Sequence, residues 1–120
     1  MNYKKAKLGY KVVRFQESGS LRPYCQHMPI YRVNNWTFPE EGAGPLTVLT
    51  TRRAACYLTK RGGTPSLKLF CCLYIPSEHD RVWHKGDAEK DGRTAADLEA
   101  SNLGILLPGC TALADAVLLF

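Results

Sequence analysis

Long hydrophobic runs are missing from this 120-residue chain. The longest apolar stretches, residues 69–75 and 112–120, are far shorter than the roughly 20 residues that a membrane-spanning helix needs. The basic N-terminal segment is not followed by the hydrophobic region and small-residue cleavage site of a secretory signal. We therefore expect a chain that acts in the cytoplasm and has no membrane partner.

A disulfide framework and a metal site are also missing from the pattern. The cysteine count is odd and two of the cysteines are adjacent: Cys25, Cys56, Cys71, Cys72 and Cys110. None of the candidate ligands follows the CxxC or HxxxH spacing of zinc sites: Cys25-x-His27, Cys71-Cys72 and His79-x4-His84. We expect reduced thiols, no metal and no cofactor, although Cys25 with His27 or His84 could still supply a nucleophile and base in space.

Catalytic and nucleotide-binding signatures are absent as well. The chain has no GxGxxG, no P-loop and no RNP motif, which argues against the standard nucleotide-binding enzymes. Glu40 and Glu41 lie in a Pro/Gly loop, and the acidic residues at 87–91 belong to a solvated charged run, so neither set predicts a carboxylate pair. The sequence carries no recognisable catalytic group.

Charge, by contrast, is abundant and unevenly placed. The net charge is +5, but residues 1–68 hold twelve Lys and Arg against three Asp and Glu, whereas residues 69–120 hold four against eight. If the fold keeps the two halves apart, one face will be electropositive and will attract phosphates, nucleic acid or an acidic protein. The alternative is that the halves mix and neutralise each other.

The clearest local pattern is a strand that runs into a helix at residues 46–62. Leu46, Val48 and Leu49 are typical of a strand, and Thr50-Thr51 offers a hydroxyl N-cap for a helix that ends at Gly62-Gly63. The start of a helix favours anions, and Arg52 and Arg53 add two positive charges in its first turn. This corner is our first candidate for an anion site.

The rest of the chain reads mostly as strands. We expect a hairpin from 8–16 and 21–25, a third extended segment at 30–36, a loop, and a central strand at 66–75. Residues 77–104 form a polar excursion that we expect to be mobile or partner-facing, with a short helix between Thr94 and Gly104. A last extended run ends at Phe120, which we expect to be docked in the sheet. The fold class is thus α+β: a single domain, 1–120, with a mostly antiparallel sheet of about five to six strands and one or two short helices packed against it.

Groups that fork onto phosphates and stack on bases gather in the basic half of the chain. The candidate ligand-binding residues are Arg14, Arg22, Tyr31, Arg32, Asn35, Trp36, Thr51, Arg52 and Arg53. Each of them, taken singly, could equally be a core residue or a solvated strand residue.

Two motifs resemble small uncharacterised proteins of phages and bacteria: GYKVVR at 9–14 and PGCTALADAVLL at 108–119. The chain departs from that pattern where Cys110 stands between Gly109 and Thr111, and where the segment 77–104 looks like an insertion. The resemblance implies a phage or mobile-element origin and a role among anti-defence proteins that sequester the nucleotide signals of bacterial immunity.

Our leading hypothesis is a non-enzymatic binding protein that sequesters a small anionic nucleotide. Further copies of the chain, in a homo-oligomer, are a second candidate partner. The arginines would clamp phosphates while Tyr31 or Trp36 stacks on a base. The alternatives are a compact ADP-ribosyltransferase-like enzyme and an inhibitor that docks on a protein or nucleic-acid partner.

Overall fold

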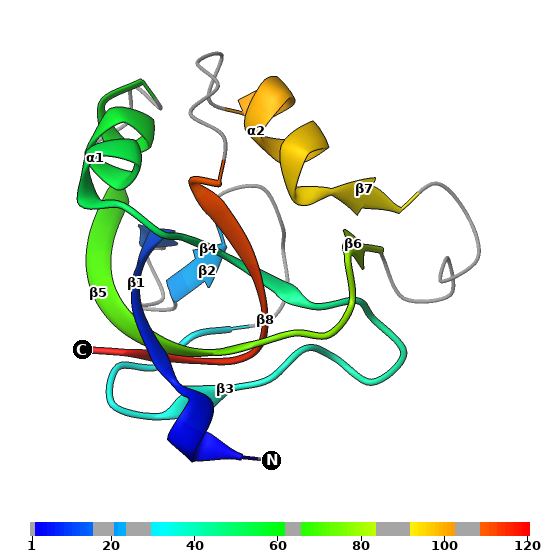
Figure 1. Cartoon of the computed structure of the whole chain (residues 1–120). Coiled ribbons are helices and arrows are strands. Elements are labelled where there is room, and N and C mark those ends of the chain that lie inside the picture. The colour runs from blue at the N-terminus through cyan, green and yellow to red at the C-terminus, as the bar shows by residue number, and fades with distance from the viewer. Residues whose placement is uncertain (1, 16–20, 24–29, 62–65, 84–91, 103–108) are drawn as a thin grey trace.

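The fold is a small α+β fold in which an antiparallel sheet closes on itself (Figure 1). The computed structural model describes residues 2–15, 21–23, 30–61, 66–83, 92–102 and 109–120. Its elements are η1 (Tyr3–Lys5), β1 (Lys7–Phe15), β2 (Leu21–Pro23), β3 (Trp36–Thr37), β4 (Leu46–Leu49), α1 (Arg52–Arg61), β5 (Leu67–Pro76), β6 (Arg81–Val82), β7 (Arg93–Thr94), α2 (Ala95–Asn102) and β8 (Thr111–Leu119). None of the helices in the described part of the chain has the length and hydropathy to cross a membrane.

Four strands close the ring. β1 pairs with β5 along most of its length, β5 pairs with β8, and β8 pairs with β4. A single residue pair, Tyr10 with Leu49, joins β4 back to β1. The short strands β2 and β3 extend this barrel-like sheet at its two ends, where β2 pairs with β1 and β3 pairs with β8. The adjacent hairpin predicted from the sequence is therefore confirmed, and Pro23 lies in its short outer arm.

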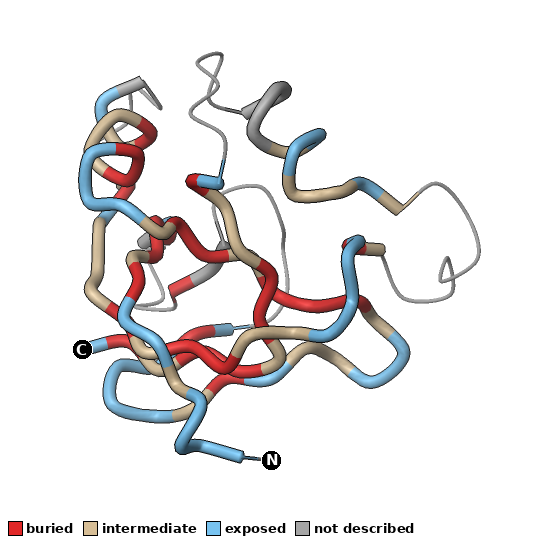
Figure 2. The backbone as a smooth tube through the Cα atoms, in the orientation of Figure 1, coloured by how far each residue is buried: buried red, intermediate tan, exposed pale blue. Residues whose placement is uncertain are grey.

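Strand alternation fills the inside of the ring. Inward-facing side chains of the large strands form one core cluster around Val13, Val48, Cys72, Val117 and Leu119, all at most 1% exposed. Figure 2 shows buried segments of the chain, in red, where the strands meet in the middle of the molecule. The apolar runs predicted at 66–75 and at the C-terminus are thus long strands of the ring, and each pairs along both edges: β5 with β1 and β8, and β8 with β5 and β4.

A second core cluster lies between the outside of the sheet and α1. Ala54, Ala55 and Leu58 of the helix pack on outward-facing residues such as Val12 and Leu67. Small alanines let the helix approach the strands closely, and Thr51 caps it by accepting a hydrogen bond from the Ala54 N–H (3.2 Å). The predicted strand-to-helix corner is confirmed, whereas its predicted Gly62-Gly63 stop lies outside the described residues.

The prediction of a third strand at 30–36 is wrong. Only Tyr31 makes an isolated bridge, to Leu21, and the chain then turns, with Asn34 in the left-handed region at φ 66°. The Asn35 N–H donates to the Arg32 carbonyl (3.2 Å), and strand pairing begins at Trp36. Asparagine tolerates this backbone conformation better than most residues, so the two adjacent asparagines favour a turn over an extended segment.

The polar segment predicted as an excursion has secondary structure in its described parts. β6 and β7 pair with each other, and α2 packs against β8. Thr94 and Asp97 form the capping box of α2, as the sequence indicated. The predicted helix end at Gly104 lies outside the described residues. At the C-terminus, the Phe120 N–H donates to the Cys71 carbonyl (3.0 Å), but the Phe120 side chain is 51% exposed.

Candidate binding pocket at the barrel mouth

The start of α1 carries the expected positive charge. Arg52 and Arg53 are both exposed in its first turn, and Thr51 is used as the cap. The Ala54 N–H is bonded to the Thr51 hydroxyl, and the Ala55 N–H bonds the Thr51 carbonyl (3.3 Å). These two N–H groups of the helix start are therefore already bonded within the chain, and the two exposed arginine side chains supply the positive charge that an anion would meet there.

The other predicted ligand residues lie in separate places. Arg14 is exposed on β1 and faces Arg22 across the hairpin, while Arg32 and Asn35 are exposed in the turn before β3. Trp36 is half-buried, with its ring centroid 5.0 Å from that of Tyr3. β8 separates the helix start from this turn, because Leu49 pairs with Thr111 at one end of β8 and Trp36 pairs with Leu118 near the other. Seven residues of strand span about 24 Å, so the structure does not bring the set together around one small ligand.

Tyr31 lies in the core, at 1% exposure, and is not a surface platform for a base. Its hydroxyl is a buried polar atom without a hydrogen-bond partner among the described residues. Burial, and secondarily the neighbouring Cys72 thiol, raises the pKa of the Tyr31 phenol. Burial likewise raises the pKa of Cys72 to about 12, although the Lys11 ammonium acts to lower it. The predicted stacking role of Tyr31 is incompatible with this position.

Lys11 is the unexpected member of the core, at 5% exposure. Its ammonium donates to the Thr47 carbonyl (2.5 Å) and to the Thr47 hydroxyl (3.3 Å), and it lies 5.4 Å from the centre of the Tyr31 ring. β1 and β4 share one register pair, Tyr10 with Leu49, and Lys11 follows directly. The Lys11 side chain thus links β1 to β4 next to their register pair. Its hydrogen bonds to Thr47 and its contact with the Tyr31 ring compensate for the burial of the charge, so a lysine is tolerated at an inward position.

A pocket of about 450 Å³ opens at one mouth of the ring. Three of the four ring strands line its wall: Lys7 at the start of β1, Tyr74 and Pro76 at the end of β5, and Thr111 to Leu113 at the start of β8. Lys7 pairs with Tyr74 in the strand register, so both side chains lie on the inner side of the sheet, where the barrel opens. A pocket of this volume is within the range that small-molecule sites use, and barrel mouths commonly hold such sites.

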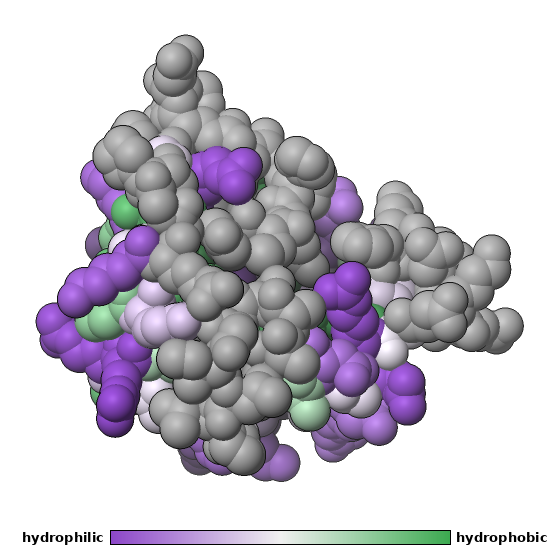
Figure 3. Space-filling model, turned by 90° about the horizontal axis from the view of Figure 1, so that it is seen from above, coloured by the Kyte–Doolittle hydropathy of each residue, from purple (hydrophilic) through white to green (hydrophobic). Residues whose placement is uncertain are grey.

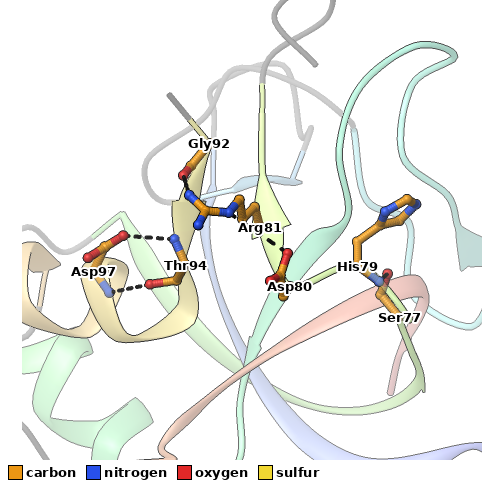
Figure 4. Close-up of polar contacts among 7 residues, drawn as sticks. All are labelled: Ser77, His79, Asp80, Arg81, Gly92, Thr94 and Asp97. Atoms are coloured by element: carbon orange, nitrogen blue, oxygen red, sulfur yellow. Dashed lines mark hydrogen bonds and ion pairs between the residues drawn. The ribbon is translucent and has the colours of Figure 1, made fainter. Parts of the chain in front are cut away.

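The rim of the pocket comes from the segment that the sequence marked as an excursion. Ser77, His79, Asp80, Thr94 and the first two residues of α2 line it. Figure 4 shows how these parts are fixed: Thr94 and Asp97 exchange two hydrogen bonds (2.9 and 3.2 Å), and Arg81 donates to the Gly92 carbonyl (3.1 Å). Asp80 lies 3.9 Å from the Arg81 side chain, which offsets part of its negative charge.

Trp83 supports the rim of the pocket by contacting His79 and the loop at Gly42 and Gly44. The His79 ring meets the Trp83 ring edge-on, with centroids 5.0 Å apart, and the Trp83 indole N–H donates to the Gly42 carbonyl (3.1 Å). The Gly44 N–H also donates to the Trp83 carbonyl (3.0 Å). A Cβ at Gly44 would lie 2.6 Å from the Trp83 nitrogen, so this approach requires glycine.

The pocket offers one exposed ammonium (Lys7), one imidazole (His79), one carboxylate (Asp80) and several hydroxyls. Burial, followed by the neighbouring Cys72 thiol, raises the pKa of Tyr74, so its phenol is a hydrogen-bond donor at neutral pH and not a base. Thr94 accepts a bond from the Asp97 N–H, and a hydroxyl that accepts one bond can still donate its own proton. The described residues contain no group of three or more His, Cys, Asp or Glu side chains that could hold a metal ion. Cys56, Cys71, Cys72 and Cys110 are free thiols, while Cys25, His27 and His84 lie outside the described residues.

Sequence reasoning missed this pocket because its lining comes from four distant segments. One signal was available: Lys7 and Lys11 are four positions apart, so they share one face of a strand whose other face carries Leu8 and Tyr10. The closure of β5 on β1, which sets Tyr74 beside Lys7, could not be seen in a local pattern.

The fold and the pocket together define a small α+β protein with a closed, barrel-like sheet and a polar pocket at one mouth. No family model, curated protein or solved structure matches the chain. Its function is therefore argued from the pocket and from the distribution of charge.

Proposed function

We propose that the protein is a non-enzymatic binding protein that sequesters a small anionic ligand of nucleotide size in the pocket at the barrel mouth. The observation that carries the proposal is the pocket itself: a space of about 450 Å³ in which Lys7 and His79 stand with the Tyr74 phenol and the Ser77, Thr94 and Thr111 side chains. Ammonium groups and imidazole N–H groups bind phosphate oxygens, hydroxyls add directional bonds, and the Tyr74 ring adds an aromatic surface.

The charge distribution supports an anion as the ligand. Eight of the described cations lie on η1, β1, α1 and the start of β5, which contact one another: Lys4, Lys5, Lys7, Arg14, Arg52, Arg53, Lys60 and Lys68. Arg32, Arg81 and Arg93 lie apart from them, in the turn before β3 and on β6 and β7. The described acidic residues lie elsewhere, on the loops around β4 and β6, on α2 and on β8. Seen from above, the coloured surface is largely hydrophilic, with hydrophobic side chains only in small areas (Figure 3). Positive charge concentrated on neighbouring elements in this way raises the local concentration of anions and speeds their arrival.

This proposal gives the arginines a different role from the phosphate clamp expected from the sequence. Arg14, Arg52 and Arg53 attract the ligand through the field, while Lys7 and His79 contact it. The biological setting that we propose, from the resemblance to phage proteins, is sequestration of a nucleotide immune signal as an anti-defence function. An enzyme of the ADP-ribosyltransferase type and a docking inhibitor are the alternatives that the experiment separates.

The test is calorimetric titration of the purified protein with a panel of mononucleotides, cyclic nucleotides and inorganic phosphate, followed by mass analysis of the recovered ligand. Lys7→Gln removes the positive charge and leaves a slightly shorter polar side chain, and should weaken binding at least tenfold, or by about 1.4 kcal/mol. Lys60→Gln is the matched control, because Lys60 is an exposed lysine on α1 and does not line the pocket.

Each outcome decides between the alternatives. An unaltered ligand, with binding lost in Lys7→Gln and kept in Lys60→Gln, supports sequestration at the pocket. A ligand recovered in changed form would favour an enzyme. If no member of the panel binds, the proposal fails and a macromolecular partner takes its place.

A further inference from the structure

One outer face of the barrel carries an apolar row that neither helix covers. Leu8 of β1 lies opposite Leu73 of β5, Leu73 lies opposite Leu118 of β8, and Leu118 lies opposite Trp36 of β3. Residues directly opposite in an antiparallel pair project to the same side of the sheet, so the four side chains form a continuous row. The next residues along each strand, such as Cys72, Leu119 and Thr37, are buried on the inner side, which fixes the row on the outside.

Exposed aromatic residues widen this row into a patch. Phe120 follows Leu118 by two residues, Phe38 follows Trp36 by two, and the Tyr3 ring contacts the Trp36 ring. Leu8 is 59% exposed, Phe120 51%, Tyr3 48% and Phe38 45%. α1 covers the same outer side only further along the strands, over Tyr10 and Val12 of β1. Figure 1 agrees, since both helices lie in the upper part of the molecule and β3, η1 and the C-terminus in the lower part.

We propose that this patch, called here the lower face, is the dimer interface for a second copy of the chain. An aromatic side chain can bury about 150–250 Å², so Tyr3, Phe38 and Phe120, which are near half exposure, each offer roughly 100 Å². Leu8 adds a similar area because it is the most exposed of the four. With the half-buried members of the row, two copies placed face to face would bury on the order of 1,000 Å², which reaches the lower limit for a specific interface.

The charges at the margins of the lower face favour a second copy of the chain as its partner. Lys4 and Lys5 of η1 stand at one margin of the lower face, and Glu40 and Glu41 follow Phe38 at another. In Figure 1, η1 lies at the lower left, and the loop between β3 and β4 extends to the lower right. A two-fold axis that passes between these margins places the lysines of each copy against the glutamates of its partner, which is the self-complementarity that an isologous interface needs.

The test is sedimentation velocity and light scattering of the full chain from micromolar to millimolar concentration. The wild-type chain should dimerise, and Leu8→Lys should weaken dimerisation at least tenfold. Ile30→Lys is the matched control, because Ile30 is 41% exposed but precedes Tyr31, which pairs with Leu21 at the β2 end of the sheet. Both positions are exposed, so thermal melts should show that both variants fold.

A charge exchange tests the two-fold arrangement itself. Lys4→Glu with Lys5→Glu should weaken the dimer, Glu40→Lys with Glu41→Lys should weaken it too, and the four changes together should restore it. A chain that stays monomeric at millimolar concentration, or a dimer that Leu8→Lys leaves intact, would overturn the proposal. Failure of the fourfold variant to recover dimerisation would overturn the arrangement. None of these results depends on whether the pocket binds a nucleotide.

Discussion

Replacing Gly9 by alanine tests the barrel closure and the pocket wall together. Gly9 is buried on the inner side of β1, and an added Cβ would lie 2.9 Å from Cε1 of Tyr74, 3.0 Å from Cδ1 of the same ring, and 3.2 Å from the Leu49 carbonyl oxygen. Tyr74 is 5% exposed and belongs to the core cluster, so its ring has to displace other packed residues in order to move. The substitution therefore overpacks the one place where β1, β4 and β5 come together.

The expected cost follows from two opposing effects. Inserting a methyl group into a packed core costs about 1–3 kcal/mol. Alanine restricts the unfolded chain more than glycine does, which returns about 0.4–1 kcal/mol. The net loss should be roughly 1–2 kcal/mol, and it should lower the Tm by about 5–10 °C in a chain of this size. Because Tyr74 also lines the pocket, ligand affinity should fall in the variant that remains folded.

Chemical denaturation of a double-mutant cycle measures the effect. In a Tyr74→Leu background the ring is gone, so Gly9→Ala should cost less there, with a coupling energy of about 0.5–3 kcal/mol. Gly109→Ala is the control: Gly109 has φ +83°, and its added Cβ would meet nothing within 4 Å, so it should destabilise through backbone strain alone and show no coupling to Tyr74. Equal costs of Gly9→Ala in both backgrounds, or a gain in stability, would refute the proposed contact.

Three further predictions concern the core and the helix start. Tyr31→Phe removes a buried hydroxyl that has no partner among the described residues, so the free energy of unfolding should stay equal or rise by up to about 1–3 kcal/mol; a clear loss in urea melts would mean that the hydroxyl is bonded. Burial raises the pKa of Cys72 to about 12, so Cys72 should resist alkylation at pH 8 in the folded protein while the partly exposed Cys71 reacts, and equal labelling in a mass-resolved time course would contradict this. Arg52→Gln with Arg53→Gln should leave stability equal or slightly higher, since arginine in the first turn opposes the helix dipole, and should slow ligand association without changing the pocket contacts; a loss of several kcal/mol in affinity would return the contact site to the helix start.

The sequence alone determined the local elements. Thr51 before an alanine-bearing helix, Thr94 with Asp97 at the second helix, and two apolar runs at β5 and β8 each depend on neighbours in the chain, and each was predicted correctly. The α+β class followed from these elements. The prediction of a strand at 30–36 was wrong because it gave the strand tendency of Tyr, Val and Trp more weight than the turn tendency of the two asparagines.

The tertiary structure decided what the candidate residues can do. Whether Tyr31 is a surface ring or a core residue depends on what packs against it, and β1, β4 and β8 surround it only after the ring closes. Lys7 and Tyr74 are 67 positions apart in the sequence, and the register of β1 on β5 makes them neighbours in one pocket wall. Strand pairing over such separations is set by the burial of both faces of the sheet at once, and the periodicity of one strand does not contain that information.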